Sequence, residues 1–303
     1  MADLMNHIVS IPLDSELASF IGKKGSEDGL TFFDRKVGND IIVLLYPTNA
    51  KEKPYSIAES MLVSEQILLS TKNVDKEFGE ALVAASLLEK RVILTDDNDV
   101  NGLLANGILK DFSVTPRDKL LDKILEQGAR AGTEMVRIDI DKAFPVHGVG
   151  TVVLGVVISG MVKVHDTLYH SSGKQGSVRS IQSQDVDVQA AGPGTRVGLA
   201  MKGIEHEDMG KGSTLSSVRI SPAKRISVKV KTSPIAKEEV KDGATYLVVS
   251  NFSHSMAKVL RSGETTELEL EKPIPVLSGD GIFLVRNQTP RLFASGSIVS
   301  ASA

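Results

Sequence analysis

The feature that most constrains the fold is a change of sequence texture after Gly128. Before that point, apolar residues recur with helical spacing between short apolar runs. After it, the helical periodicity stops, and short runs rich in Val and Ile alternate with glycine-centred turns as far as Ala303. Many short strands separated by such turns are typical of β-barrels. The rear of the chain is therefore predicted to form two successive β-barrels that meet near Ser221 and Pro222.

The front of the chain, residues 1–128, has the pattern of an α/β domain. Strands are expected at 7–12, 30–34, 40–46, 91–95 and 111–114, and helices at 14–21, 54–68, 75–89 and 116–127. Asp14 or Ser15 is suited to cap the first helix, and Pro54 to open the second. The second helix is expected to include Ile67 and Leu68, which continue its apolar spacing. Strands that alternate with helices predict a mostly parallel sheet.

Composition excludes several classes of protein. The chain of 303 residues has no Cys, so disulfides and thiolate metal sites are excluded. No apolar run approaches the roughly 20 residues that span a bilayer, and the N-terminus has no basic leader. A soluble cytoplasmic protein without a membrane partner is expected. Residues 1–128 hold 14 Lys and Arg against 21 Asp and Glu, whereas the rear is mildly basic. This charge asymmetry would orient the chain in the field of a nucleic acid, or it is ordinary variation between domains. No part of the chain is basic enough for a dedicated DNA-binding domain.

Glycines punctuate the first strands of the rear half. Gly148 and Gly150 could be mistaken for a dinucleotide-binding fingerprint, but position 153 is Val and a strand follows rather than a helix. Gly155 and Gly160 lie within expected strands, where glycine marks a bulge or a close approach of two backbones. The simplest role of these glycines is to let the barrel close.

These motifs carry a resemblance to a known family. The segment 141–166, the segment 191–204 and Gly212 resemble the second-domain barrel of translational GTPases, closest to the SelB branch of archaea and close also to EF-Tu. The segments 272–286 and 291–299 resemble the last barrel of the same factors. The resemblance implies a degenerate GTPase-like α/β domain at 1–128, a domain 2 barrel at 129–220 and a domain 3 barrel at 221–303.

The resemblance also implies a pocket on the second barrel for the tRNA-linked amino acid and the terminal adenosine. Asp141, Lys142 and Phe144 match one wall of that pocket. Leu154 stands where a Thr is common, and Arg196 stands where EF-Tu has Asn and SelB has Arg. An Arg fork can grip a carboxylate or phosphate, and an aromatic ring can stack under a base. The alternative is that Phe144 is a core residue and Arg196 a solvated charge.

The last barrel of this family is expected to face the T-stem side of the tRNA. Arg286 and Arg291 are the residues of this chain that match that surface. One residue is inserted between them relative to the family pattern, so their individual roles stay open.

The front domain lacks the phosphate-binding motif of the family. That motif, Gly-x-x-x-x-Gly-Lys-Ser/Thr, places backbone N–H groups, a Lys and a hydroxyl around phosphates and Mg²⁺. Here residues 12–17 contain neither Gly nor Lys, and Asp14 and Glu16 would repel phosphates. Gly-Lys pairs begin at Gly22, Gly173 and Gly210, and none is followed by Ser or Thr.

The remaining nucleotide motifs are eroded as well. Only residues 34–38 remain of the family's Asp-x-x-Gly region, and 21–30 leave no room for its first switch. The segment 95–99 stands where the family has the guanine-binding motif Asn/Thr-Lys-x-Asp, and it lacks the Lys of that motif. The acids at 96, 97 and 99 are candidates for a metal, although an acidic solvated loop explains them equally simply. No catalytic constellation, nucleotide site, cofactor or resident metal is predicted.

The sequence therefore predicts a binding protein rather than an enzyme. Its partner is expected to be an aminoacyl-tRNA, or a translation complex through the ribosome or a translation factor, bound without GTP hydrolysis. One rival is a protein–protein adaptor that kept the barrels as a scaffold. The other rival is an active GTPase that uses unrecognised residues, which the missing motif disfavours.

Overall fold

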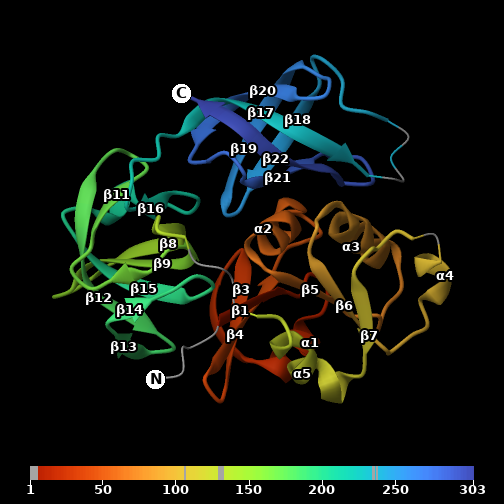
Figure 1. Ribbon diagram of the computed structural model, residues 1–303, viewed down its shortest axis with the longest axis horizontal. Helices are drawn as coiled ribbons and strands as arrows, with labels where there is room; N and C mark the ends of the chain where they lie inside the picture. Colours follow the sequence, from red (N-terminus) through yellow and green to blue (C-terminus); the bar gives the residue numbers. More distant parts are fainter. Residues whose placement is uncertain (1–5, 106, 129–132, 234–235, 237) are drawn as a thin grey trace.

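The computed structural model describes residues 6–105, 107–128, 133–233, 236 and 238–303. Figure 1 shows an α/β unit in red to yellow, a green β unit beside it and a blue β unit above it. The expected boundary between 128 and 129 borders residues 129–132, which lie outside the described ranges, as does Met1. The limits of the three domains therefore stay a prediction. No helix of the described ranges is long and apolar enough to cross a membrane.

The α/β unit is built from thirteen elements in chain order. They are β1 (Asn6–Ser10), α1 (Ser15–Ile21), β2 (Lys23–Asp28), β3 (Leu30–Val37), β4 (Asp40–Pro47), α2 (Tyr55–Val63), β5 (Gln66–Leu69), α3 (Lys76–Leu87), β6 (Arg91–Thr95), α4 (Asn101–Leu104), β7 (Phe112–Thr115), the 3-10 helix η1 (Arg117–Lys119) and α5 (Leu120–Leu125).

The seven strands of this unit form one sheet in the order β2-β3-β4-β1-β5-β6-β7. β1 pairs in parallel with β4 and β5, and β5, β6 and β7 continue the parallel part. The mostly parallel sheet is thus confirmed. β2, β3 and β4 pair antiparallel instead. β3 and β4 are joined by a two-residue hairpin turn at Gly38 and Asn39, with Gly38 at φ +59°, and β2 and β3 are joined at Gly29, with φ +73°.

Two expectations about the front half were wrong. The helix opened by Pro54 ends at Val63, and Ile67 and Leu68 belong to strand β5 between β1 and β6. Lys90 Nζ donates to the carbonyls of Met61 and Leu62 and so caps the end of α2. A strand buried on both faces is apolar throughout, so its residues can match helical spacing by chance. β2 was also missed, because its residues are all polar or Gly.

Helices cover both faces of the sheet. α2 and α3 pack over one face around Phe78 and Leu94, and this core continues into the last barrel through Phe283. α1 and α5 pack over the other face around Leu17 and Ile93. α1 begins where the side chain of Asp14 accepts a hydrogen bond from the Leu17 amide, as the sequence predicts.

The middle unit is a closed barrel. Its elements are β8 (Arg137–Val146), β9 (Gly150–Ser159), β10 (Val162–Lys163), β11 (Thr167–His170), β12 (Gln175–Ser183), β13 (Val186–Val188), β14 (Ala190–Ala191), β15 (Arg196–Lys202), the 3-10 helix η2 (His206–Asp208) and β16 (Thr214–Ser216). The ring runs β11-β16-β8-β9-β15-β12 and closes through the β11–β12 pairing. A Cβ at Gly155 would lie 2.6 Å from the Asp139 carbonyl oxygen, so the close approach of β8 and β9 requires glycine there.

The last unit is a second closed barrel, in the order β17-β20-β19-β18-β21-β22. Its strands are β17 (Ala223–Thr232), β18 (Thr245–Ser250), β19 (Ser253–Arg261), β20 (Thr266–Ile274), β21 (Gly281–Val285) and β22 (Leu292–Ser302). α2 and α3 lie directly beneath this barrel in Figure 1, and Ser295 Oγ donates to the Leu87 carbonyl across the junction. The prediction of two successive barrels after an α/β domain is confirmed.

A buried ion network joins the two barrels. Arg137 donates through Nε to Asp139 at 2.9 Å and through Nη1 to both oxygens of Asp280, at 2.8 and 2.7 Å. Asn251 and Thr214 also donate to Asp139. Burial opposes the charge, yet the two carboxylates raise the pKa of the Arg137 guanidinium above its ordinary value. The barrels are therefore held by charge-assisted bonds as well as by apolar contact.

Candidate functional site

Asp141 and Arg196 lie together on the middle barrel. Asp141 occupies a bulge of β8, where the register with β9 shifts between Ile140 and Lys142. Arg196 begins β15, which lies on the other side of β9. The guanidinium Nη2 donates to Asp141 Oδ2 at 2.9 Å. The structure thus brings together the two oppositely charged residues that the sequence assigns to one pocket.

The α/β unit holds the same guanidinium from the opposite side. Arg196 Nη2 also donates to Ser26 Oγ of β2 at 2.7 Å, and its Cζ lies 3.5 Å from the ring centroid of Phe32 on β3. The side chain of Arg196 is 12% exposed and that of Asp141 is 5% exposed. Stacking of a guanidinium on a ring at this distance is favourable. The interpretation of Arg196 as a solvated charge is therefore wrong.

The surroundings of Arg196 are electrostatically unusual. Burial raises the pKa of the Asp141 carboxyl, and the Arg196 guanidinium opposes that shift. Burial also raises the pKa of Asp34 on β3, again against the effect of Arg196. Within the described residues, Asp141 Oδ1, Asp34 Oδ1 and Arg196 Nε are buried without a hydrogen-bond partner. Such atoms are uncommon in folded proteins, so this cluster has capacity for further polar contacts.

The other predicted pocket residues lie on neighbouring strands. Lys142 Nζ lies 3.7 Å from Asp28 Oδ2 of β2, and both side chains are well exposed. Leu154 of β9 stands opposite Lys142 in the ladder, and Phe144 stands two residues further along β8. Phe144 and Leu154 are both half-buried. Their contact with a tRNA end stays a prediction.

The two arginines of the last barrel that match the tRNA-facing surface, Arg286 and Arg291, are engaged within the chain. Arg286 Nη1 donates to Glu238 at 3.1 Å, and its Cζ lies 4.1 Å above the ring of Phe293. Arg291 Nε donates to Glu80 of α3 at 2.8 Å. Arg291 therefore lies at the junction with the α/β unit. The tRNA-facing role of both arginines stays a prediction.

Sequence reasoning missed a contact that joins all three units. Glu59 of α2 is fully buried, Lys211 of the middle barrel donates to it at 2.7 Å, and His254 Nδ1 of β19 lies 3.5 Å from it. The ring of Tyr55 packs against that of His254, with centroids 4.6 Å apart. The available signal was Glu59 itself, an acid between the apolar residues Ile57 and Met61 of the expected helix. A buried acid needs a partner, which here comes from both barrels.

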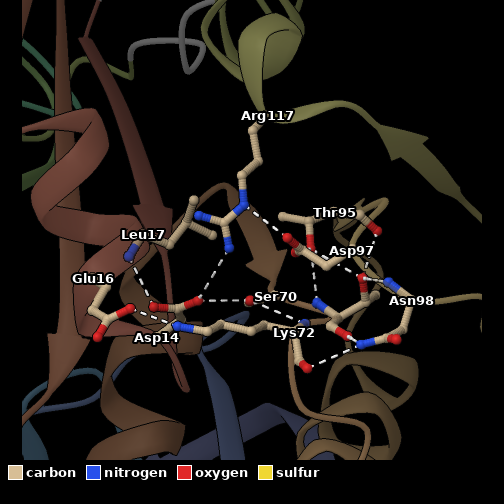
Figure 2. Close-up of polar contacts among 10 residues, drawn as sticks. Asp14, Glu16, Leu17, Ser70, Lys72, Thr95, Asp97, Asn98 and Arg117 are labelled. Atoms are coloured by element: carbon tan, nitrogen blue, oxygen red, sulfur yellow. Dashed lines mark hydrogen bonds and ion pairs between the residues drawn. The ribbon is translucent and has the colours of Figure 1, made fainter.

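The carboxyl ends of the parallel strands form the second candidate surface. In open α/β sheets, ligands bind in the crevice at this edge. Figure 2 shows Asp14, which follows β1, accepting from the Leu17 amide at 2.8 Å and from Ser70 Oγ at 2.7 Å. Beside it, Glu16 accepts from Lys72 Nζ at 2.6 Å. The N-terminus of α1 is thus already capped by a carboxylate of its own chain.

The same network extends to the loops after β6 and β7. Arg117 Nε donates to Asp97 Oδ1 at 2.8 Å, and Thr95 Oγ1 donates to the other oxygen of Asp97 (Figure 2). Burial opposes ionisation of Asp97, but the bonds from Arg117 and Thr95 outweigh it and lower the pKa of that carboxyl. Asn98 Nδ2 bonds the carbonyl of Lys72 at 3.0 Å. Asp97 and Asn98 of this loop therefore help to hold neighbouring loops together.

Carboxylates and cations both line the cavity at this edge. The cavity has a volume of about 560 Å³ and is lined by residues 12–16, 46, 48–52, 57, 70, 72, 73, 75, 77 and 291. The amide that would face a phosphate donates to Asp14, and carboxylates of Asp14 and Glu16 would repel an anion. In the described part of the chain, no group of three or more His, Asp or Glu is arranged to hold a metal ion.

An α/β unit followed by two closed β-barrels is also the architecture of solved structures of elongation factor SelB. The family described as elongation factor Tu domain 2 matches residues 150–216. The chain is thus related to translation elongation factors of the EF-Tu and SelB type.

Individual relatives support this relationship. An uncharacterized protein of Methanocaldococcus jannaschii is 29% identical over 88% of this chain and 90% of its own length. The selenocysteine-specific elongation factor of the same organism is 26% identical over 84% of this chain, which spans 61% of that factor. The crystal structure of elongation factor SelB from Methanococcus maripaludis, in complex with a GTP analogue, matches the fold with a TM-score of 0.82 at 20% identity. That match covers 100% of this chain and 80% of the SelB chain.

Proposed function

We propose that this protein binds the acylated 3′ end of a tRNA on its middle barrel and does so without hydrolysing GTP. The observation that carries the proposal is the Arg196–Asp141 pair, 2.9 Å apart on the barrel that matches elongation factor Tu domain 2. An Arg fork provides fixed donors for ester or phosphate oxygens, and the acid holds that fork in position. Lys142, Phe144 and Leu154 supply a charge and apolar surface on the adjoining strands.

The front domain serves as a docking and packing unit in this proposal. Support comes from the Asp14 cap on α1 and from the ion pairs that link the loops at the carboxyl edge. Without the γ-phosphate switch that orders loops in GTPases, cargo leaves by dissociation or competition. A translation factor that binds tRNA or the ribosome is expected to act in the cytoplasm.

The test is binding of aminoacyl-tRNA and deacylated tRNA to wild type, Arg196→Ala and Arg179→Ala. Removal of a charge-assisted bond worth about 1.5–3 kcal/mol predicts a loss of roughly 10- to 150-fold for Arg196→Ala. Arg179 lies on the same barrel and is exposed, so it is the matched control for a general loss of positive charge. Folding of each variant is checked by its melting temperature.

Aminoacyl-tRNA is expected to bind more tightly than deacylated tRNA, because the amino acid is itself part of the ligand. Equal binding of both, with Arg196→Ala matching wild type, would remove the proposed site. A protein–protein adaptor would then be the better account, because Arg291, which matches the tRNA-facing surface of the family, is bound to Glu80 at the domain junction instead. An adaptor shows no steep fall of RNA binding with salt, whereas a tRNA binder does.

A further inference from the structure

The predicted pocket is covered by an edge of the α/β unit. β2 lies over Arg196 through Ser26, and Phe32 of the adjoining β3 stacks on the guanidinium. Arg196 and Asp141 are only 12% and 5% exposed as a result. A ligand that reaches the Arg196 guanidinium has to displace this edge first.

The cover offers the groups that a ligand would offer. Ser26 gives Arg196 a hydroxyl oxygen at 2.7 Å, and Asp28 gives Lys142 a carboxylate oxygen at 3.7 Å. Phe32 of β3 is 1% exposed and stays paired with β4, so its ring is a fixed wall of the site that stacks on the guanidinium rather than part of the cover. Oxygen acceptors are the features by which Arg196 and Lys142 would recognise an acylated nucleotide end. The cover and the ligand therefore compete for the same donors.

β2 is built to detach more easily than the rest of the sheet. It is the edge strand, so it has a single neighbour, β3, and their register slips between Lys24 and Glu27. Its six residues, Lys23–Asp28, are exposed or half-buried along its whole length. Short, polar, irregular edge strands belong to the least stable parts of a fold. β3 and β4 keep their pairing without it.

We propose that β2, residues Lys23–Asp28, is an autoinhibitory cover that must lift from Arg196 before the middle barrel takes its ligand. The proposal rests on the proposed function, since it concerns access to the same site. The structure is the closed state, and the ligand selects the open one. The cover replaces the nucleotide-driven opening that the front domain has no residues to support.

A cross-link that reduction cleaves tests the cover directly, because the chain has no Cys of its own. Asp28→Cys combined with Lys142→Cys places one thiol on β2 and one on the barrel, where the native side-chain tips lie 3.7 Å apart, and a bis-maleimide reagent with an internal disulfide joins the two thiols. The matched control is Lys174→Cys with Asp208→Cys, whose native side chains meet at 2.7 Å within the middle barrel. Binding of aminoacyl-tRNA is measured for each variant before and after reduction, with cross-link formation checked by mass spectrometry.

The cross-linked Asp28/Lys142 pair is expected to bind at least 10-fold more weakly than its own reduced form, which keeps the cleaved reagent on both thiols. The cross-linked control pair should bind as its reduced form does. Equal binding in both forms of the Asp28/Lys142 pair, with the cross-link present, overturns the cover and leaves the site intact. Absence of binding in every reduced form, wild type included, overturns the proposed function instead.

A second variant needs no cross-link. Ser26→Ala removes one contact of the cover and no residue of the barrel, so it is expected to tighten aminoacyl-tRNA binding by about 2- to 10-fold. Ser19→Ala, on the exposed side of α1, should leave affinity unchanged. Weaker binding by Ser26→Ala would mean that Ser26 belongs to the site itself, and it would refute a competing cover.

Discussion

Replacement of Arg137 should show how much of the free energy of unfolding comes from buried charge rather than from apolar packing between the barrels. The side chain is 3% exposed, and it bonds Asp139 of its own barrel and Asp280 of the next. Arg137→Ala leaves both carboxylates without their cation at a site that excludes water. Loss of one partner of a buried ion pair costs about 3–5 kcal/mol. At about 2–4 °C per kcal/mol, the melting temperature should fall by roughly 6–20 °C, toward the lower end for a chain of this length.

The matched control is Arg225→Ala. Arg225 also pairs with an acid, Glu269, at 3.1 Å, but it is 64% exposed. Exposed pairs contribute about 0–1 kcal/mol, so this variant should melt close to wild type. Both variants are compared by thermal and urea unfolding at one pH and salt concentration. The reasoning is refuted if Arg137→Ala costs no more than Arg225→Ala, because the network would then add nothing to the apolar contact of the barrels.

Three further outcomes are expected. Titration with GTP and Mg²⁺ should give no binding heat at about 1 mM ligand, a concentration that would detect even a binding free energy of about 4 kcal/mol. A micromolar dissociation constant for GTP would contradict the role given to Asp14. Ile42→Ala should lower the unfolding free energy by about 2–5 kcal/mol, because Ile42 is fully buried in the sheet, and an unchanged melting temperature would count against that core. Burial lowers the pKa of His170, so the unfolded state takes up more protons below its pKa of about 6.5. Stability should therefore fall as pH drops from about 7 to 5, with a shallower fall in His170→Gln by melting temperature, and equal slopes would exclude this source.

The fold could be read from the sequence wherever the period of apolar residues was unambiguous. Glycine turns between Val-rich runs indicated both barrels, and Asp14 indicated the start of α1. The errors fell on two strands of opposite character. β5 is buried on both faces, so its apolar residues fit the spacing of a helix. β2 consists of polar residues and Gly, so its sequence is typical of a loop. In both cases the strand conformation depends on pairing with neighbouring strands of the sheet, and the local sequence does not predict that pairing.

The candidate site could be predicted only in part for a related reason. Asp141 and Arg196 were placed together by resemblance, and the structure joins them at 2.9 Å. Ser26 and Phe32 were missed because they come from the α/β unit, more than 100 residues away in sequence. Contacts between units depend on how the units pack against each other, and a motif within one unit does not predict them. The Glu59 contact was missed as well, although an acid on the buried helix α2 was a signal that a partner was required.

The proposed cover over Arg196 would limit the apparent affinity of the site for its ligand. A site that is open in a fraction f of molecules binds its ligand with an apparent dissociation constant raised by 1/f. If the contacts of Ser26 and Asp28 hold the closed state at about 99%, apparent affinity is about 100-fold weaker than that of the open barrel. A ligand with donors for Asp141 and acceptors for Arg196 would recover that cost, whereas a deacylated end would recover less of it. Under the proposed function, selectivity for an acylated end would then come from competition with the protein's own strand rather than from a nucleotide switch.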